Sequence, residues 1–124
     1  MVPIKKEEEC IKLFEKVLGT KRSDSHTFDF LLGDKGTKLP VDAYFPDYKL
    51  VVEYMGLQHY VSVPHFDRKA ERPEKRRRYF DRRREELPKH GIKLIEFKYD
   101  ELLTEENVRK KLRDIGIATH PVKQ

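Results

Sequence analysis

Cysteine is almost absent from this chain, and Cys10 is the only one. A single cysteine excludes an intramolecular disulfide and every zinc module built from several cysteines, which favours a reducing compartment. No apolar run approaches the length of a membrane span, and no signal-peptide segment follows Met1. We therefore expect an intracellular, cytoplasmic protein without a membrane partner.

Hydrophobic residues are also scarce, at 37%, whereas charged residues make up 40% of the chain. That balance is typical of disordered chains, but the seven Phe and six Tyr lie in periodic segments, which indicates a folded domain with a charged surface. With 124 residues and neither a repeat nor a linker, we expect one domain over residues 1–124. Its C-terminal tail, from about residue 117, is predicted to be mobile.

The positive charge is concentrated in one segment, although the net charge is only +5. Residues 68–84 carry ten Lys and Arg side chains against three acidic ones, Glu71, Glu74 and Asp81. Such a density attracts polyanions, and the arginine guanidinium binds phosphate oxygens through two donors at once. A solvated helix face is the alternative explanation. The carboxylates just upstream favour nucleic acid.

The pattern of apolar residues predicts the order of the secondary structure. We expect helices, strands and a hairpin in this order: helix 3–19, hairpin 26–45, strand 49–55, helix 70–91, strand 92–99 and helix 104–116. The strand 49–55 is apolar on both sides of Glu53, which is typical of a central strand covered on both faces. The order predicts an α/β domain with a mixed central sheet flanked by helices.

Two carboxylates lie within the most hydrophobic stretch, VDAYFPDYKLVVEYMGLQHY at residues 41–60. Asp42 and Glu53 are eleven residues apart across a turn, so they should lie close together on neighbouring strands. Two carboxylates at that range repel each other, and a divalent cation relieves the repulsion. Mg²⁺, which keeps some of its waters, suits a site that also holds a phosphate. Glu7 or Glu8 of the first helix could add a third oxygen ligand.

Phosphodiester hydrolysis also needs an activated water. His59 has a pKa suited to accepting its proton, Gln58 could orient it, and Asp81 could fix the tautomer of His59. Each residue also has a structural explanation. Asp42 could cap a strand end, Glu53 could pair with an arginine, His59 could be a packing residue, and Asp81 could form an ion pair within its helix.

Taken together, these residues resemble the restriction-endonuclease-like superfamily, named for its PD-(D/E)XK motif. Its core is a helix, a three-strand meander, a helix and a strand. The resemblance is carried by VDAYFPDYKLVVEYMGLQHY, then RRRYFDRRREELPKHG, then IKLIEFKYDEL. Within the superfamily, the chain is most similar to the very-short-patch-repair (Vsr-like) endonucleases and the related EDxHD homing-endonuclease group.

The resemblance implies a role for each matching residue. Asp42 matches the metal-binding aspartate, and Glu53 stands where the superfamily has its second acidic ligand. His59 matches the histidine of the EDxHD group and Asp81 its final aspartate. Glu8, or else Glu7, matches the leading glutamate.

The sequence also departs from these families in two places. The superfamily's lysine after Glu53 is absent, so Gln58 or His59 would have to replace its function. A chain with one cysteine also cannot reproduce the structural zinc site of the repair endonucleases, which argues against a mismatch-repair role.

The expected function is that of a Mg²⁺- or Mn²⁺-dependent DNA endonuclease. Its cation is expected on Glu8, Asp42 and Glu53, and its catalytic residues would be Asp42, Glu53, Gln58, His59 and Asp81. The arginines expected on the phosphate backbone are Arg76, Arg77, Arg78, Arg82 and Arg83. Specificity at this size would need a homodimer or a further DNA-recognition partner. The alternatives are a nucleic-acid-binding module that has lost catalysis and an accessory subunit of a DNA-processing complex.

Overall fold

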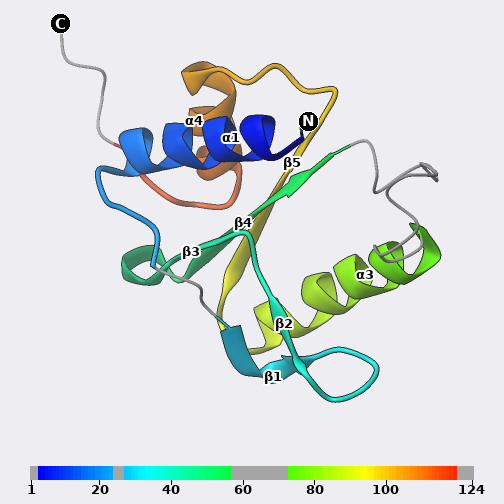
Figure 1. The fold of residues 1–124 in the computed structure, drawn as a ribbon. Helices are drawn as coiled ribbons and strands as arrows, with labels where there is room; N and C mark the ends of the chain where they lie inside the picture. Colours follow the sequence, from blue (N-terminus) through cyan, green and yellow to red (C-terminus); the bar gives the residue numbers. More distant parts are fainter. Residues whose placement is uncertain (1–2, 24–26, 57–72, 120–124) are drawn as a thin grey trace, which may run out of the picture.

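The computed structural model describes residues 3–23, 27–56 and 73–119. The elements, in chain order, are α1 (Pro3–Leu18), β1 (Thr27–Leu32), β2 (Lys38–Pro40), β3 (Ala43–Phe45), the 3₁₀ turn η1 (Pro46–Tyr48), β4 (Leu50–Met55), α3 (Pro73–Lys89), β5 (Lys93–Lys98) and α4 (Glu105–Asp114). Figure 1 shows their arrangement. The predicted order of helices and strands is confirmed.

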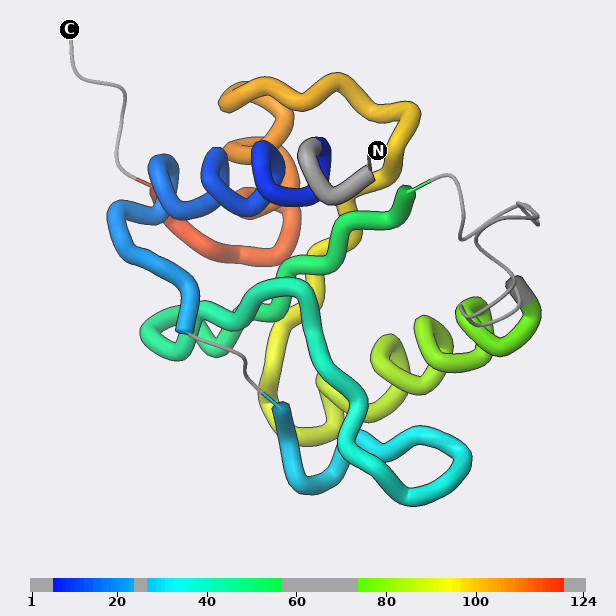
Figure 2. The backbone as a smooth tube through the Cα atoms, in the orientation of Figure 1, coloured from blue at the N-terminus to red at the C-terminus, as the bar shows by residue number. Residues whose placement is uncertain are grey.

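The strands form two small sheets, not the one central sheet that the sequence predicted. β1 and β2 form an antiparallel hairpin, while β3, β4 and β5 form a mixed sheet in which β4 pairs antiparallel with β3 and parallel with β5. The second predicted strand is interrupted at residues 41–42, where the chain bends between β2 and β3 (Figure 2). Pro40 has no N–H to donate, and the N–H of Asp42 donates to a side chain instead of to a neighbouring strand.

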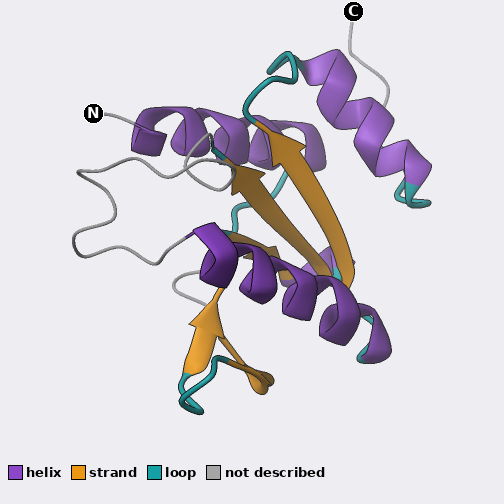
Figure 3. Cartoon of the chain, turned by 90° about the vertical axis from the view of Figure 1, so that its right-hand side faces the viewer, coloured by secondary structure: helices purple, strands orange, loops and turns teal. Residues whose placement is uncertain are grey.

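The three-stranded sheet lies between two layers of helix. α1 and α4 cover one face, and α3 covers the other (Figure 3). Side chains alternate along β4, so Leu50, Val52 and Tyr54 pack with α1 and α4, whereas Val51 packs beneath α3. Every residue of β4 is buried, as predicted for a central strand. By the same alternation, Glu53 faces α3.

Local signals in the sequence placed the helix ends correctly. Gly19, just after α1, has a φ of 74°, and its N–H donates to Glu15 O as expected for a glycine that ends a helix. The side chain of Thr104 accepts a hydrogen bond from the N–H of Asn107 at the start of α4, which confirms the predicted cap.

The C-terminal segment is ordered further than the sequence suggested. Ile117 is buried in the core that α1 and α4 share with the sheet, and its N–H donates to Leu112 O at 2.9 Å. Ile117 itself is therefore part of the fold, and the rest of the predicted tail, from residue 120 on, lies outside the described residues.

Candidate functional site

Asp42 and Glu53 lie side by side where the chain enters β3. Ala43 of β3 pairs with Val52 of β4 in antiparallel register, which sets Asp42 opposite Glu53. The main-chain N–H of Asp42 donates to Glu53 Oε2 at 3.0 Å, and the N–H of Tyr54 donates to Asp42 Oδ2 at 2.8 Å. These two hydrogen bonds, one from the N–H of Asp42 and one from the N–H of Tyr54, hold both carboxylates in place. The closeness predicted from their eleven-residue spacing is confirmed.

Both carboxyl groups are held in an environment that disfavours their charge. Glu53 is only 3% exposed, and Asp42 is partly buried. Burial, followed by the charge of Asp42, raises the pKa of Glu53 well above its ordinary value. Burial likewise raises the pKa of Asp42, against the hydrogen bond from Tyr54 N–H. Ionising both carboxyl groups together is therefore unfavourable, and the charge of Arg83 offsets only part of that cost.

Glu7 of the first helix lies near enough to Asp42 for their charges to interact. Burial, and then the charge of Asp42, raises the pKa of Glu7 to about 7, and the charge of Glu7 in turn raises the pKa of Glu53. Glu8 is one residue further along α1 and therefore about 100° further around it. Since no three acids among the described residues are arranged to hold a metal ion, the choice of Glu8 or Glu7 as a third ligand stays a prediction.

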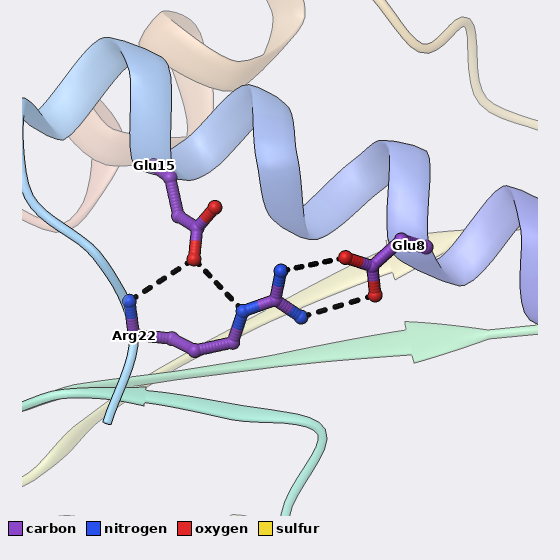
Figure 4. Close-up of polar contacts among 3 residues, drawn as sticks. All are labelled: Glu8, Glu15 and Arg22. Atoms are coloured by element: carbon purple, nitrogen blue, oxygen red, sulfur yellow. Dashed lines mark hydrogen bonds and ion pairs between the residues drawn. The ribbon is translucent and has the colours of Figure 1, made fainter. Parts of the chain in front are cut away.

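Arg22, in the loop that follows α1, binds two carboxylates of that helix at once (Figure 4). Its Nη1 and Nη2 donate to the two oxygens of Glu8 at 3.2 and 2.7 Å. Its Nε and its main-chain N–H donate to Glu15 Oε2 at 2.8 and 3.1 Å. The hydrogen bonds from Arg22 lower the pKa of Glu8, so this carboxylate stays ionised. The contacts tie the loop after α1 to two glutamates of that helix.

Replacing Arg22 by alanine is expected to lower the free energy of unfolding by about 1–3 kcal/mol, because two partly buried carboxylates lose their charged donor. The matched control is Lys110→Ala, which removes an exposed ion pair of 3.2 Å to Asp114 and should change stability by no more than about 0.5 kcal/mol. Urea unfolding followed by circular dichroism measures both variants. Equal losses in the two variants would contradict the special position of Arg22.

A pocket of about 180 Å³ lies on the α3 side of the carboxylate pair and is lined by Arg76, Arg83 and aromatic side chains of α3. Arg83 donates through Nη2 to Pro40 O at 2.9 Å, and its Nε lies 3.8 Å from Glu53 Oε2. Arg76 is only 7% exposed. Both arginines were predicted to hold an exposed phosphate backbone. They instead face inward, because the same helix face that buries Phe80 also carries them.

Two further arginines of α3 bind the β1–β2 hairpin. Arg78 and Arg82 both pair with the carboxylate of Asp34, and Arg82 Nη1 also donates to Leu32 O at 2.9 Å. Their predicted contact with phosphate therefore competes with an internal contact. Arg77 is exposed, and no ion pair joins it to another residue within the described parts of the chain. It is the one predicted phosphate-binding arginine that faces solvent without such competition among those residues.

Asp81 is not brought together with Asp42 and Glu53. Its carboxylate pairs with Arg84 at 3.0 Å, and its side chain is 65% exposed. Arg84 also binds Glu96 at 2.7 Å, so Asp81 belongs to a surface network of ion pairs. The ion pair within the helix, weighed from the sequence as an alternative, is present. The other two predicted catalytic residues, Gln58 and His59, lie outside the described residues.

Asp42 and Glu53 are suitable donors for Mg²⁺ or Mn²⁺. Each uses one oxygen, Oδ2 or Oε2, to accept a main-chain N–H and has a second oxygen besides. Mg²⁺ is commonly held by one or two carboxylates and keeps several waters, so a complete protein cage is not required. Across residues 3–23, 27–56 and 73–119, no set of three His, Cys, Asp or Glu side chains is arranged to hold a metal ion. The described part of the site is thus a pair of carboxylates with Glu7 nearby.

Sequence patterns did not reveal Arg22 and Asp34, which position the elements around the site. Both lie in polar loops, where no periodicity indicates which way a side chain turns. The only available signal was charge complementarity, since Arg22 follows a glutamate-rich helix and Asp34 precedes an arginine-rich one. That signal does not select a partner among so many charges.

Comparison with known proteins gave no match to this chain among family models, curated proteins or solved structures. The functional argument therefore rests on the geometry of the site. Among the described helices, none has both the length and the apolar character needed to cross a membrane.

Proposed function

We propose that this protein is a Mg²⁺- or Mn²⁺-dependent endonuclease that hydrolyses phosphodiester bonds in DNA. The observation that carries the proposal is the pair Asp42 and Glu53, which lie opposite each other, with the N–H of Asp42 bound to Glu53 and the N–H of Tyr54 bound to Asp42. Burying carboxylates side by side costs free energy, and an apolar pair would stabilise the fold better. Such costly pairs with raised pKa values are typical of metal-binding and catalytic sites.

The fold supports the same proposal. α1, the hairpin with β3 and β4, then α3 and β5 follow the order of helix, meander, helix and strand that the resemblance to the restriction-endonuclease-like superfamily implies. Asp42 and Glu53 stand at the positions that this resemblance assigns to metal ligands. We therefore propose membership of that superfamily, with the acidic pair at the start of β3 and within β4.

Each residue near the pair has a defined part in the proposed chemistry. Asp42 and Glu53 hold the cation, which supplies charge for the phosphate and a water of lowered pKa. Arg83, whose Nε is 3.8 Å from Glu53, limits repulsion between the two carboxylates. His59, with Gln58, is proposed to accept the proton of the attacking water. We leave Asp81 out of the catalytic set because it is bound to Arg84.

Supercoiled plasmid incubated with the wild-type protein and Mg²⁺ or Mn²⁺ is expected to become nicked or linear, as seen on an agarose gel. Excess EDTA should stop the reaction, because Asp42 and Glu53 alone leave the phosphate charge uncompensated. A plasmid that stays intact in both metals, at micromolar protein, would refute the proposed activity.

A second candidate function is a nucleic-acid-binding module that has lost catalysis. Met55 stands two residues after Glu53 on β4, where the superfamily has its lysine, and it is only 3% exposed. A buried methionine cannot polarise a water or a phosphate oxygen. Salt-dependent DNA binding without cleavage in either metal would favour this function, and absence of both would favour an accessory subunit that contacts protein.

A further inference from the structure

A larger hollow adjoins Asp42 on the side away from α3. It has a volume of about 730 Å³ and lies between α1 and the segment that joins β2 to β3. We call it the α1 cleft and define it by its charged lining residues: Glu8, Lys12, Glu15, Lys21, Arg22 and Asp42. Its volume is within the range of ligand-binding sites. Because Asp42 lines both this cleft and the pocket beneath α3, the cleft adjoins one of the two proposed metal ligands.

The α1 cleft is lined by three basic side chains, Lys12, Lys21 and Arg22, and by three acidic ones, Glu8, Glu15 and Asp42. Arg22 donates four hydrogen bonds to the carboxylates of Glu8 and Glu15 (Figure 4). Lys12 and Lys21 are both exposed at the same cleft. Without Arg22 the two glutamates would repel a polyanion. Arg22 offsets one of their two charges, and the charges of Lys12 and Lys21 also act on Glu8 and Glu15 and lower their pKa. A divalent cation on Asp42 would leave this lining with a net positive charge.

Three arginines of α3, Arg77 not among them, are less suited to a phosphate backbone than these two lysines. Arg78 and Arg82 are occupied by Asp34, and Arg83 is directed at Pro40 O and Glu53. A phosphate at any of these side chains would first have to displace an existing partner. Lys12 and Lys21 are exposed, and they act on Glu8 and Glu15 through their charge but form no ion pair of 4 Å or less among the described residues.

We propose that the phosphodiester backbone of the DNA lies in the α1 cleft, with Lys12 and Lys21 on phosphates that flank the one presented to Asp42. The inference rests on the proposed nuclease function, because that function is what makes DNA the occupant. Arg22 acts as a positioning residue, since it holds Glu8 and Glu15 along the wall of the cleft and offsets one of their two charges. The arginine-rich face of α3 then mainly supports the site and the hairpin.

The test is the salt dependence of DNA binding, measured by fluorescence anisotropy with a labelled duplex in Ca²⁺, a hard cation that takes the same oxygen ligands. A denaturing gel checks that the duplex stays intact. Lys12→Ala and Lys21→Ala should each weaken binding several-fold and lower the slope of log K against log salt by about 0.9, the value for one lost phosphate contact.

Lys93→Ala is the matched control, because it removes the same charge from an exposed residue of β5, the edge strand opposite β3. Its slope should equal that of the wild type. Unchanged slopes for Lys12→Ala and Lys21→Ala, or no binding by the wild type, would overturn the proposal. So would a lowered slope confined to Arg77→Ala, which would move the DNA to α3.

The test also separates this inference from the proposed function. Binding is read without cleavage, so lowered slopes for both lysine variants support the α1 cleft even if the plasmid remains intact in Mg²⁺ and Mn²⁺. Conversely, a protein that cleaves plasmid but shows unchanged slopes retains the nuclease function and loses the cleft as its DNA-binding surface.

Discussion

Replacing Asp42 by asparagine is expected to lower the rate of plasmid cleavage by about 10²–10³-fold, the range that loss of one transition-state-stabilising group produces. The amide keeps the shape of the side chain and an oxygen to accept the N–H of Tyr54, so the strand pairing should survive. What disappears is the negative charge beside Glu53 that the cation needs. Initial rates of conversion of supercoiled plasmid in Mg²⁺ measure the effect.

The matched control is Asp47→Asn, the same chemical change in the exposed turn η1 between β3 and β4. This variant should cleave at the wild-type rate. Calorimetric titration with Mn²⁺ gives a second readout, in which Asp42→Asn should lose metal binding while Asp47→Asn keeps it. Wild-type cleavage by Asp42→Asn would exclude Asp42 from the catalytic site, whatever the rest of the chain does.

Replacing Glu53 by glutamine is expected to stabilise the metal-free protein at pH 8 while removing activity. Glu53 is buried, and its pKa is raised by burial and by Asp42, so its ionised form costs free energy in the folded state. The neutral amide keeps an acceptor for the N–H of Asp42 and should add about 1–3 kcal/mol to the free energy of unfolding at that pH. The corresponding rise in Tm is roughly 5–10 °C.

The raised pKa of Glu53 determines how the stability of the wild type changes with pH. The pKa of Glu53 is higher in the folded protein than the ordinary value of 4.5, so above that pH the folded chain binds protons that the unfolded chain releases. Stability of the wild type therefore falls as the pH rises from about 4.5 through the raised pKa. Glu7, with a pKa raised to about 7, contributes to the same decline. At pH 5, wild type and Glu53→Gln should differ little.

Differential scanning fluorimetry in EDTA from pH 5 to pH 8 measures this profile. Glu85→Gln, an exposed glutamate on α3, is the control and should follow the wild type at every pH. A Tm difference between wild type and Glu53→Gln that stays constant across the range would show that Glu53 is ionised throughout. That result would contradict the claim that burial beside Asp42 raises the pKa of Glu53.

The carboxylate pair is the part of the site that could be predicted from the sequence. A tight turn between two apolar segments determines which residues face each other, because strand pairing is regular. Asp42 and Glu53 follow from that rule, and the structure gives the register that it requires. The interruption of the second strand could not be foreseen. It depends on the hydrogen bond that the N–H of Asp42 donates to the carboxylate of Glu53.

The choice between Glu7 and Glu8 shows where sequence reasoning ends. Both lie in the first turns of the same helix, and amphipathic periodicity places either near the sheet. Arg22 binds Glu8 from a loop fourteen residues further along the chain, whereas Glu7 interacts with the charge of Asp42. Such a contact depends on where a loop runs, which local sequence does not determine.

The basic segment gave the most misleading prediction. Composition alone suggested a phosphate-binding helix face, but Arg76 and Arg83 lie inward, and Arg78 and Arg82 bind Asp34. Sequence by itself determined the order of helices and strands, the acidic pair and the positive charge, because these follow from periodicity and short-range pairing. Only the tertiary structure decided which charges are used internally and which meet solvent, since that depends on side chains brought together from distant segments.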